Sequence, residues 1–486
     1  MRHAIVEEIA TPLTAVQIAQ EVHQEPFAFF LDSGMNEHGL GRYSFIGSSP
    51  FLILRSRGPN ITLLRPQGRE RVEGNPSRTV DRLLDQYALD RSDTPTPFVG
   101  GAVGYFSYDL CHFIERLPSH AVDDLVLPEC FLAFYDSGIT FDHVTGKVYV
   151  SSSGFPEHDE DRRLQKAARR VQQLRERLRA NPSQNDPVYR PVGHDGDSAT
   201  SRAPAGARLR CTFTPDEYVR AVQTAREYIA AGDIFQVNLS QRFEADLTST
   251  PFELYQRLRR INPAPFAAYL NFDEVKVVSA SPERFLRVSG DRVETRPMKG
   301  TRPRGNSAAE DQALAEELQA SAKDRAENVM IVDLERNDLG RVCHFGTVKV
   351  RELWTLERYA TVFQLTSTVE GRLRQGYNRM QLLEACFPGG SITGAPKVRS
   401  MEIIDELEPT RRSVYTGAIG YLGFDGEMDL NIAIRTILVK GTRVYFQVGG
   451  GIIYDSDPVA EYEETMDKAK ALFLSLGLSP RVEVPA

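Results

Sequence analysis

The sequence is poor in cysteine. Its 486 residues include five cysteines, an odd number with no C-x-x-C spacing. Disulfide pairs and cysteine-based zinc sites need cysteines in pairs, so we expect free, buried thiols in a reducing compartment. The five are Cys111, Cys130, Cys211, Cys343 and Cys386.

Long apolar runs are missing as well. No stretch approaches the roughly 18 consecutive apolar residues that a membrane-spanning helix needs. Glu7 and Glu8 stand where a signal peptide would carry its apolar segment. These two features predict a cytoplasmic protein.

Positive charge is in deficit, with 58 Lys and Arg against 66 Asp and Glu, a net charge of −8. A nucleic-acid-binding protein would need a basic face, so that class is disfavoured. The net charge also repels anions, so an anionic substrate would need local cationic side chains or a metal ion. The composition, 41% hydrophobic and 26% charged, is that of a globular protein with a large core.

Short strands alternate irregularly with helices, which predicts an α+β fold with largely antiparallel sheets. Residues 181–207 are rich in Pro, Ser, Asp and Gly without periodicity, which predicts a flexible linker between regions 1–180 and 208–486. Strands are expected at 27–31, 43–47, 98–109, 131–135, 148–151, 234–243, 267–270, 276–279, 284–288, 347–350, 413–421, 430–439 and 444–449. Helices are expected at 161–180, 215–231, 308–332, 378–385, 396–407 and 459–476.

The segment 295–305 carries a single lysine, Lys299, next to Gly300 and Thr301. Two Arg-Pro pairs flank it and hold the backbone extended. A small ligand could approach closely beside Gly300, with the Thr301 hydroxyl as a donor. Lys299 itself could be a solvated cation, an anion-binding charge or a desolvated nucleophile. The segment alone favours the solvated cation.

Two helices each place acidic side chains on one face. Asp324 and Glu327 are spaced i, i+3 near the end of the expected helix 308–332, and Glu461, Glu464 and Lys468 are spaced i, i+3, i+7 on the last helix. Solvated acidic faces are the simpler interpretation. Two well-separated helices that each offer a carboxylate face would also suit Mg²⁺, if substrate and water supply its other ligands.

Two glycine-rich segments and two charged residues have alternative explanations. Segment 387–397 leads into a helix whose N-terminal amides could hold an anion, and Gly449–Gly451 ends a strand either as a ligand platform or as a tight turn. Glu283 follows Ser-Pro and would by default lie in the first turn of a helix. Arg435 lies in the apolar strand 430–439 and needs an ion pair or a ligand carboxylate.

Eight segments, in order, resemble the chorismate-utilising enzymes. This family includes anthranilate synthase component I and the aminodeoxychorismate, isochorismate and salicylate synthases. The resemblance implies two packed, largely antiparallel sheets flanked by helices, with N-terminal strands completing the sandwich. The segments are QVNLS (236–240), NPAP (262–265), SPE (281–283), KGTR (299–302), DRAEN (324–328), RNDLG (336–340), GGSITGAPK (389–397) and EYEET (461–465).

Within the family, three features resemble the members that form aminodeoxychorismate. Lys299 stands where the anthranilate, isochorismate and salicylate enzymes usually have alanine. The loop 389–397 and the segment 262–266 also differ from the usual anthranilate synthase pattern. Gln236 stands where the isochorismate and salicylate enzymes keep a lysine that activates water, so ammonia is the expected incoming group.

The resemblance also implies residue roles. Lys299 would add to the ring carbon beside the ring carboxylate, and Glu283 would protonate the departing hydroxyl. Mg²⁺ would be held by Glu327 and Glu464, supported by Glu461 and Asp324. The remaining substrate contacts would come from Gln236, Gly300, Thr301, Tyr415, Arg435, Gly449, Gly451 and Lys468.

The expected reaction is amination of chorismate to 4-amino-4-deoxychorismate, for para-aminobenzoate and folate synthesis. The alternative is anthranilate synthase component I, which also eliminates pyruvate; a third possibility is a catalytically inactive binding subunit. No cysteine lies in a G-x-C-x-G turn, so ammonia is expected from a separate glutamine amidotransferase subunit.

Two further positions bear on these alternatives. Gln364 stands where the anthranilate enzymes and many relatives carry histidine. The segment 31–33 corresponds to a region that helps to hold inhibitory tryptophan in anthranilate synthases. The residues alone leave open whether an effector binds here.

Overall fold

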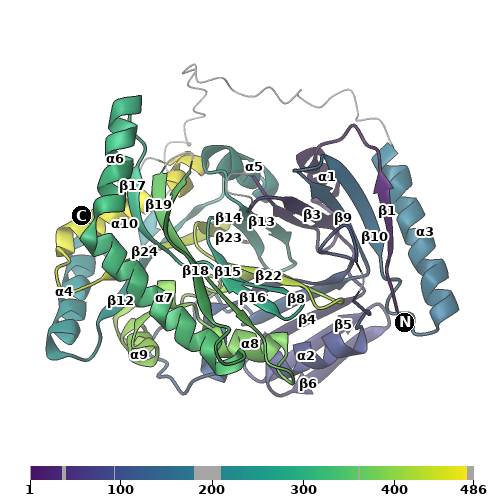
Figure 1. Cartoon of the computed structure of the whole chain (residues 1–486), viewed down its shortest axis with the longest axis horizontal. Coiled ribbons are helices and arrows are strands. Elements are labelled where there is room, and N and C mark those ends of the chain that lie inside the picture. The colour runs from purple at the N-terminus through teal and green to yellow at the C-terminus, as the bar shows by residue number, and fades with distance from the viewer. Residues whose placement is uncertain (1, 35–39, 92, 180–208, 360–361, 479–486) are drawn as a thin grey trace.

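The computed structural model of the chain describes residues 2–34, 40–91, 93–179, 209–359 and 362–478. Two large sheets pack face to face, and helices cover their outer faces (Figure 1). Every strand pair in the ladders of the described residues is antiparallel in both sheets. The predicted α+β sandwich is therefore confirmed, whereas the predicted linker at 181–207 lies outside the described residues.

The first sheet joins strands from both ends of the chain, because β2 pairs with β13. Its strands, in spatial order, are β1 (Ile5–Ile9), β10 (Lys147–Ser152), β9 (Ser137–Asp142), β3 (Tyr43–Gly47), β2 (Phe29–Asp32), β13 (Phe266–Asn271), β14 (Lys276–Ser281), β23 (Thr436–Lys440), β24 (Arg443–Ile452), β12 (Gln236–Asp246) and β11 (Arg210–Cys211), with β20 (Gly394–Ala395) beside β12.

The second sheet is joined in the same way, because β7 pairs with β21. Its strands are β17 (Met298–Pro303), β19 (Val362–Arg372), β16 (Arg292–Thr295), β15 (Arg284–Ser289), β22 (Met428–Ile432), β21 (Ala418–Gly423), β7 (Gly101–Phe106), β8 (Cys130–Tyr135), β4 (Leu52–Arg57), β5 (Asn60–Arg65) and β6 (Gly68–Glu73), with β18 (Lys349–Arg358) beside β19.

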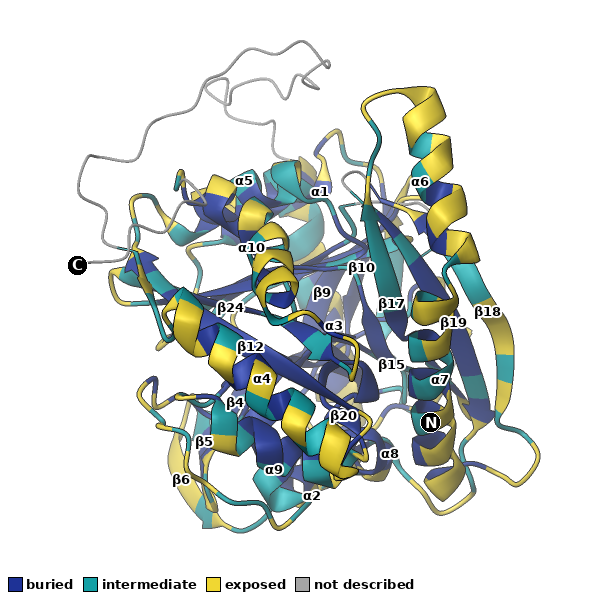
Figure 2. Cartoon of the chain, turned by 90° about the vertical axis from the view of Figure 1, so that its left-hand side faces the viewer, coloured by how far each residue is buried: buried dark blue, intermediate teal, exposed yellow. Residues whose placement is uncertain are grey.

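The helices lie outside the sandwich, and α4 and α10 turn exposed faces to solvent in Figure 2. They are α1 (Ala15–Val22), α2 (Pro76–Gln86), α3 (Glu160–Arg179), α4 (Pro215–Ala231), α5 (Pro251–Ile261), α6 (Ala308–Ala320), α7 (Ala322–Val342), α8 (Arg379–Cys386), α9 (Lys397–Leu407) and α10 (Pro458–Ser475), with short 3₁₀ turns η2 (Tyr108–Phe113) and η3 (Gly390–Ile392). No helix in these described ranges is long and apolar enough to cross a bilayer.

The alternation of side chains along the strands builds the core. On β13, Ala268 and Leu270 join the apolar layer between the sheets, whereas Ala267 and Tyr269 pack on the helix-covered outer face. Both faces of this central strand are therefore buried. Such a strand has a continuous apolar sequence, which is why it could be predicted.

The cap of α4 follows its sequence pattern. Thr214 accepts a hydrogen bond from the Glu217 amide, and the Glu217 carboxylate accepts one from the Thr214 amide at 2.8 Å. Gly232 ends the helix with φ +85°, a conformation that suits glycine. The predicted helix 215–231 is confirmed at both ends.

The expected single helix 308–332 is wrong, because the helix is interrupted at Ser321. This residue ends α6 and caps α7, with its hydroxyl accepting from the Asp324 amide at 3.2 Å. Asp324 and Glu327 therefore lie in the first turns of α7, not near the end of a long helix. Serine is a preferred residue at such a cap position, but no Gly or Pro in the sequence marks the end of α6.

The chain crosses between the sheets at two adjacent points, each carrying a predicted site residue. Glu283 lies between β14 and β15, and Arg435, with φ +51°, lies between β22 and β23. The Ile432 amide donates to the Glu283 carbonyl oxygen at 3.0 Å, and the Ala280 amide donates to the Arg435 carbonyl oxygen at 3.1 Å. The expected single strand 430–439 and the expected helical turn at Glu283 are both wrong.

Two smaller expectations can also be checked. The expected strand 413–421 begins only at Ala418, so Tyr415 lies in the preceding turn rather than in a strand. All five cysteines are free as predicted, and the predicted burial is confirmed for four of them, whereas Cys211 is half-buried.

Candidate active site

Lys299 and Gln236 meet over Gly451, at the end of the first sheet. A Cβ atom added to Gly451 would clash with the Gln236 amide nitrogen and would lie 3.2 Å from the Lys299 Nζ. These groups come from β17, β12 and β24, so both sheets contribute. The missing side chain at Gly451 leaves the space in which the lysine and the amide lie side by side.

Lys299 is not a solvated surface cation. Burial is the largest cause that lowers the pKa of its ammonium; the Glu327 carboxylate opposes this shift and the Lys468 ammonium adds to it. A lowered pKa increases the neutral fraction, the form in which an amine is a nucleophile. Next to it, β17 is bulged at Gly300, which has φ +80°.

Glu283 is a buried carboxyl close to Lys299. Burial raises its pKa to about 7, while a hydrogen bond from Ser391, the Lys299 charge and the Met298 amide oppose the shift. The Ser391 hydroxyl donates to Glu283 Oε1 at 2.6 Å. A carboxyl with this pKa can hold and release a proton near neutral pH.

The Glu327 carboxylate of α7 and the Glu464 carboxylate of α10 both interact electrostatically with Lys299. Burial raises the pKa of Glu327, and Glu464 is one of the charges that raise it further. The Lys468 ammonium lies 2.6 Å from Glu464 Oε1 and lowers the pKa of that carboxyl. Glu461 Oε1 accepts a hydrogen bond from Ser456 at 2.6 Å, and burial raises the Glu461 pKa.

This donor set suits a divalent cation only in part. Within the described residues, no three His, Cys, Asp or Glu side chains surround one point. Glu327 and Glu464 could hold Mg²⁺ together with substrate and water oxygens, which this hard ion prefers. The mutual repulsion of the two carboxylates fits that use, although Glu464, whose side chain is 54% exposed, would share its charge with Lys468.

Tyr415 and Arg435 form the other end of the cluster. Burial raises the pKa of Tyr415 to about 12, and Arg435 is among the charges that oppose the shift. The Arg435 guanidinium donates to the Lys468 carbonyl oxygen. Arg435 makes no ion pair with any described residue, so a ligand carboxylate is the better explanation for this half-buried cation.

Two predicted residues have local explanations that do not require a ligand, and a third has only its place in a ladder. At Gly449, an added Cβ would lie 2.5 Å from the Leu239 carbonyl oxygen, so strand packing requires glycine. Asp324 forms an ion pair with Arg302 at 3.2 Å. Thr301 stands opposite Gln364 in the β17–β19 ladder. Roles for these residues in binding stay predictions.

The glycine-rich segment 389–397 acts differently from an open anion site. Its Gly390 amide donates to the Glu335 carboxyl at 2.9 Å, and its Ser391 hydroxyl donates to Glu283. Residues Gly394 and Ala395 pair with the start of β12, where Gln236 lies. The segment therefore links the buried acid Glu283 to the Gln236 strand. Sequence reasoning missed Ser391 and Glu335, because each matters only through tertiary contact.

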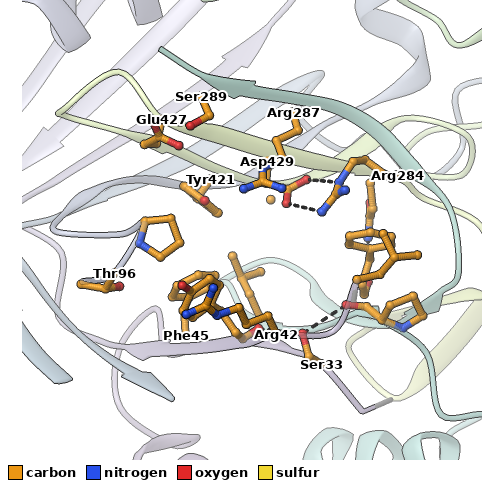
Figure 3. A pocket seen from close by; sticks show the side chains of 18 of the residues that line it. Ser33, Arg42, Phe45, Thr96, Arg284, Arg287, Ser289, Tyr421, Glu427 and Asp429 are labelled. Carbon is orange, nitrogen blue, oxygen red and sulfur yellow. Dashed lines mark hydrogen bonds and ion pairs between the residues drawn. The ribbon is translucent and has the colours of Figure 1, made fainter. Parts of the chain in front are cut away.

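A separate cavity of about 450 Å³ lies between the sheets. Figure 3 shows Ser33 and Arg42 on one side of it and the bidentate Arg284–Asp429 pair on the other. Lys299 and Gln236 do not line it. Asp32 also lines the cavity but is engaged within the protein, accepting hydrogen bonds from Tyr255 at 2.8 Å and from Arg259.

Comparison with known proteins shows the family of this chain. The sequence pattern of the chorismate binding enzyme family matches residues 61–474. The chain belongs to this family. Anthranilate synthase component 1 of Thermus thermophilus is 40% identical over 481 residues, 98% of each chain. Aminodeoxychorismate synthase component 1 of Bacillus subtilis is 38% identical over 441 residues, 90% of each chain.

A solved structure shows the same fold for a family member. The crystal structure of anthranilate synthase component I from Streptococcus pneumoniae superposes with a TM-score of 0.75 at 34% identity, covering 88% of this chain and 91% of that chain. This chain is thus an enzyme of the chorismate-utilising family. The identities of 40% and 38% are too close to decide between its named activities.

Proposed function

We propose that this enzyme aminates chorismate with ammonia to 4-amino-4-deoxychorismate, a precursor of para-aminobenzoate and folate. The observation that carries the proposal is Lys299, a half-buried lysine of lowered pKa that lies beside Gln236 and interacts electrostatically with Glu283. Direct addition of ammonia does not require a lysine nucleophile. A lysine nucleophile is required when the incoming amine replaces the ring hydroxyl through a covalent intermediate.

The proposed reaction balances as a substitution in two steps. The neutral Lys299 amine bonds to the ring carbon beside the ring carboxylate, the double bonds shift, and the hydroxyl leaves as water with the proton of Glu283. Ammonia then bonds to the carbon that carried the hydroxyl, and the Lys299 nitrogen leaves. The Glu283 carboxylate accepts a proton from the new ammonium. The net change is chorismate plus ammonia to aminodeoxychorismate plus water.

Other residues would bind the two carboxylates of the substrate. Arg435, with Tyr415, suits the enolpyruvyl carboxylate because it is half-buried without an internal ion pair among the described residues. Lys468 and the Gly451 platform would contact the ring. Mg²⁺ on Glu327 and Glu464 would supply positive charge at the ring carboxylate.

A glutamine amidotransferase subunit is the proposed source of ammonia. The relatives named above carry the label component 1. Here the five cysteines are free and none lies in a nucleophile turn, so this chain offers no glutaminase site of its own. Free thiols also support a reducing, cytoplasmic setting.

The alternative is anthranilate synthase component I, the name carried by the Thermus relative. Incubation with chorismate, Mg²⁺ and ammonium, followed by mass spectrometry, separates the two. The proposal expects an amino product that retains its enolpyruvyl group. Anthranilate and free pyruvate as main products would refute it. Unconsumed chorismate would favour an inactive binding subunit.

A further inference from the structure

Glu335 is a buried carboxyl of α7 that the mechanism above does not use. Its side chain is 2% exposed. Oε1 accepts from the Gly390 amide at 2.9 Å, whereas Oε2 is buried without a hydrogen-bond partner among the described residues. A charged carboxylate with one bare oxygen would lose hydration without replacement, so this environment favours the neutral acid.

The hydrogen bond from Gly390 holds a turn that reaches Glu283. The next residue, Ser391, donates its hydroxyl to Glu283 Oε1 at 2.6 Å. A Cβ at Gly390 would lie 2.7 Å from Leu334 Cδ2, so this turn lies flat against α7. One peptide unit therefore connects the Glu335 contact to the Glu283 contact.

Three groups on other elements lie near Glu335 and could affect its charge: Lys397, Glu283 and Cys386. Lys397 on α9 lies 2.5 Å from Asp338 Oδ2 and donates to the Cys386 carbonyl oxygen at 2.8 Å, so this cation is already engaged. Glu283 and the buried Cys386 thiol carry no positive charge. Burial, with Asp338 as the next cause, raises the pKa of Glu335 to about 8.

We propose that Glu335 is a neutral positioning residue for Glu283: it fixes the Gly390–Ser391 turn so that the Ser391 hydroxyl points at the Glu283 carboxyl. The inference rests on the proposed role of Glu283 as proton donor. The serine hydrogen bond stabilises the carboxylate that forms when Glu283 gives up its proton. A loosened turn leaves Glu283 with a higher pKa and makes it a poorer donor.

The test compares Glu335→Met, which keeps side-chain length but loses the acceptor, with Glu335→Gln, which keeps a neutral acceptor. Glu335→Met should lower kcat about tenfold with little change in the KM for chorismate. Because kcat requires protonated Glu283, it falls as pH rises through the Glu283 pKa. Loss of the serine hydrogen bond raises this pKa, so the falling limb should move to higher pH. Glu335→Gln should restore most of kcat and the parent limb.

The Ser391→Ala variant identifies the route. Alone, it should lower kcat and move the limb as Glu335→Met does; in the double variant, the two losses should not multiply, because both remove one hydrogen bond. Any of three results would overturn the proposal. The kcat losses could multiply in the double variant, the pH profile of kcat could stay unchanged in Glu335→Met, or Glu335→Gln could be as impaired as Glu335→Met.

The readout is chorismate disappearance with saturating ammonium, whichever product forms. Formation of anthranilate would refute the proposed product without affecting this comparison. Conversely, a correct product with an unmoved limb would refute only the role of Glu335. The two claims therefore fail separately.

Discussion

The Lys468 ammonium lies 2.6 Å from Glu464 Oε1, one turn earlier on α10. The same Nζ donates to the Gly449 carbonyl oxygen at 2.9 Å, which ties the helix to β24. A lysine therefore shares the carboxylate that we assign to Mg²⁺. The ion and the ammonium must divide its charge, so their affinities for the site are coupled.

Removal of either proposed metal carboxylate should weaken Mg²⁺ binding. Glu327→Gln and Glu464→Gln each delete one negative charge from a site with few protein ligands, and we expect about a tenfold loss of affinity. Lys468→Met should have the opposite effect on Mg²⁺, because it removes the competing cation. Isothermal titration with MgCl₂ at constant ionic strength measures all three.

The matched control for the metal prediction is Glu463→Gln. Glu463 is exposed on the same helix, so its loss changes the charge without changing the site. Its Mg²⁺ affinity should equal that of the parent. Unchanged affinity in both Glu327→Gln and Glu464→Gln would show that the metal assignment is wrong.

Lys299→Ala should abolish most of the amination. The substitution removes the reacting nitrogen, and we expect a loss of about 10³-fold or more in kcat. Chorismate affinity and the thermal midpoint should change little, because no core contact is lost. Lys470→Ala, an exposed lysine on α10, is the control. An alanine variant that aminates chorismate near the parent rate would exclude the covalent role.

The pH dependence of stability tests the neutral state of Glu335 directly. Its pKa is raised from 4.5 to about 8 in the folded protein, so the folded chain holds this proton more tightly than the unfolded chain. The resulting stabilisation is complete below pH 4.5 and is lost as pH rises toward 8. Glu335→Gln lacks this loss.

Urea unfolding at pH 5.5 and pH 8 makes this comparison. The parent should lose stability relative to Glu335→Gln between these values, on the order of 2 kcal/mol. The exposed Glu463→Gln variant should follow the parent at both. If the free energy of unfolding changes equally between pH 5.5 and pH 8 in the parent and in Glu335→Gln, Glu335 is ionised in the folded state.

Local signals made part of the fold predictable. The box formed by Thr214 and Glu217 marked α4, and the apolar runs of β13 and β14 marked central strands. The break at Ser321 carried a weaker signal, and the crossing at Arg435 carried none. Apolar residues continue on both sides of Arg435 while the chain moves from one sheet to the other, and only the packing of both sheets determines this crossing.

The site was predictable to the extent that it depends on residue type and spacing. The i, i+3 spacing placed Glu461 and Glu464 on one helix face. Lys299 could be singled out because the anthranilate, isochorismate and salicylate enzymes usually have alanine at this position. The contact between Glu335 and Gly390 spans 55 residues in sequence. A glutamate inside a helix has no local signature for such a contact, so only the structure could reveal it.

The last prediction concerns Gln364, which stands opposite Thr301, two residues from Lys299, in the β17–β19 ladder. Its Oε1 is buried without a partner among the described residues, so it suits a hydrogen bond to substrate. Pyruvate elimination needs a base that removes a ring proton. A histidine can serve near neutral pH, but a glutamine amide cannot.

The parent enzyme should therefore release its amino product with the enolpyruvyl group attached and form no pyruvate. Mass spectrometry of the product, with a coupled lactate dehydrogenase assay for pyruvate, measures both. Gln364→His separates two causes. If this variant forms pyruvate, the parent fails to eliminate pyruvate because it lacks a base at this position. If it forms none, Lys299 determines which product is released, and Gln364 only donates or accepts a hydrogen bond. Pyruvate from the parent would refute the prediction, because an enzyme that already eliminates needs no histidine at this position.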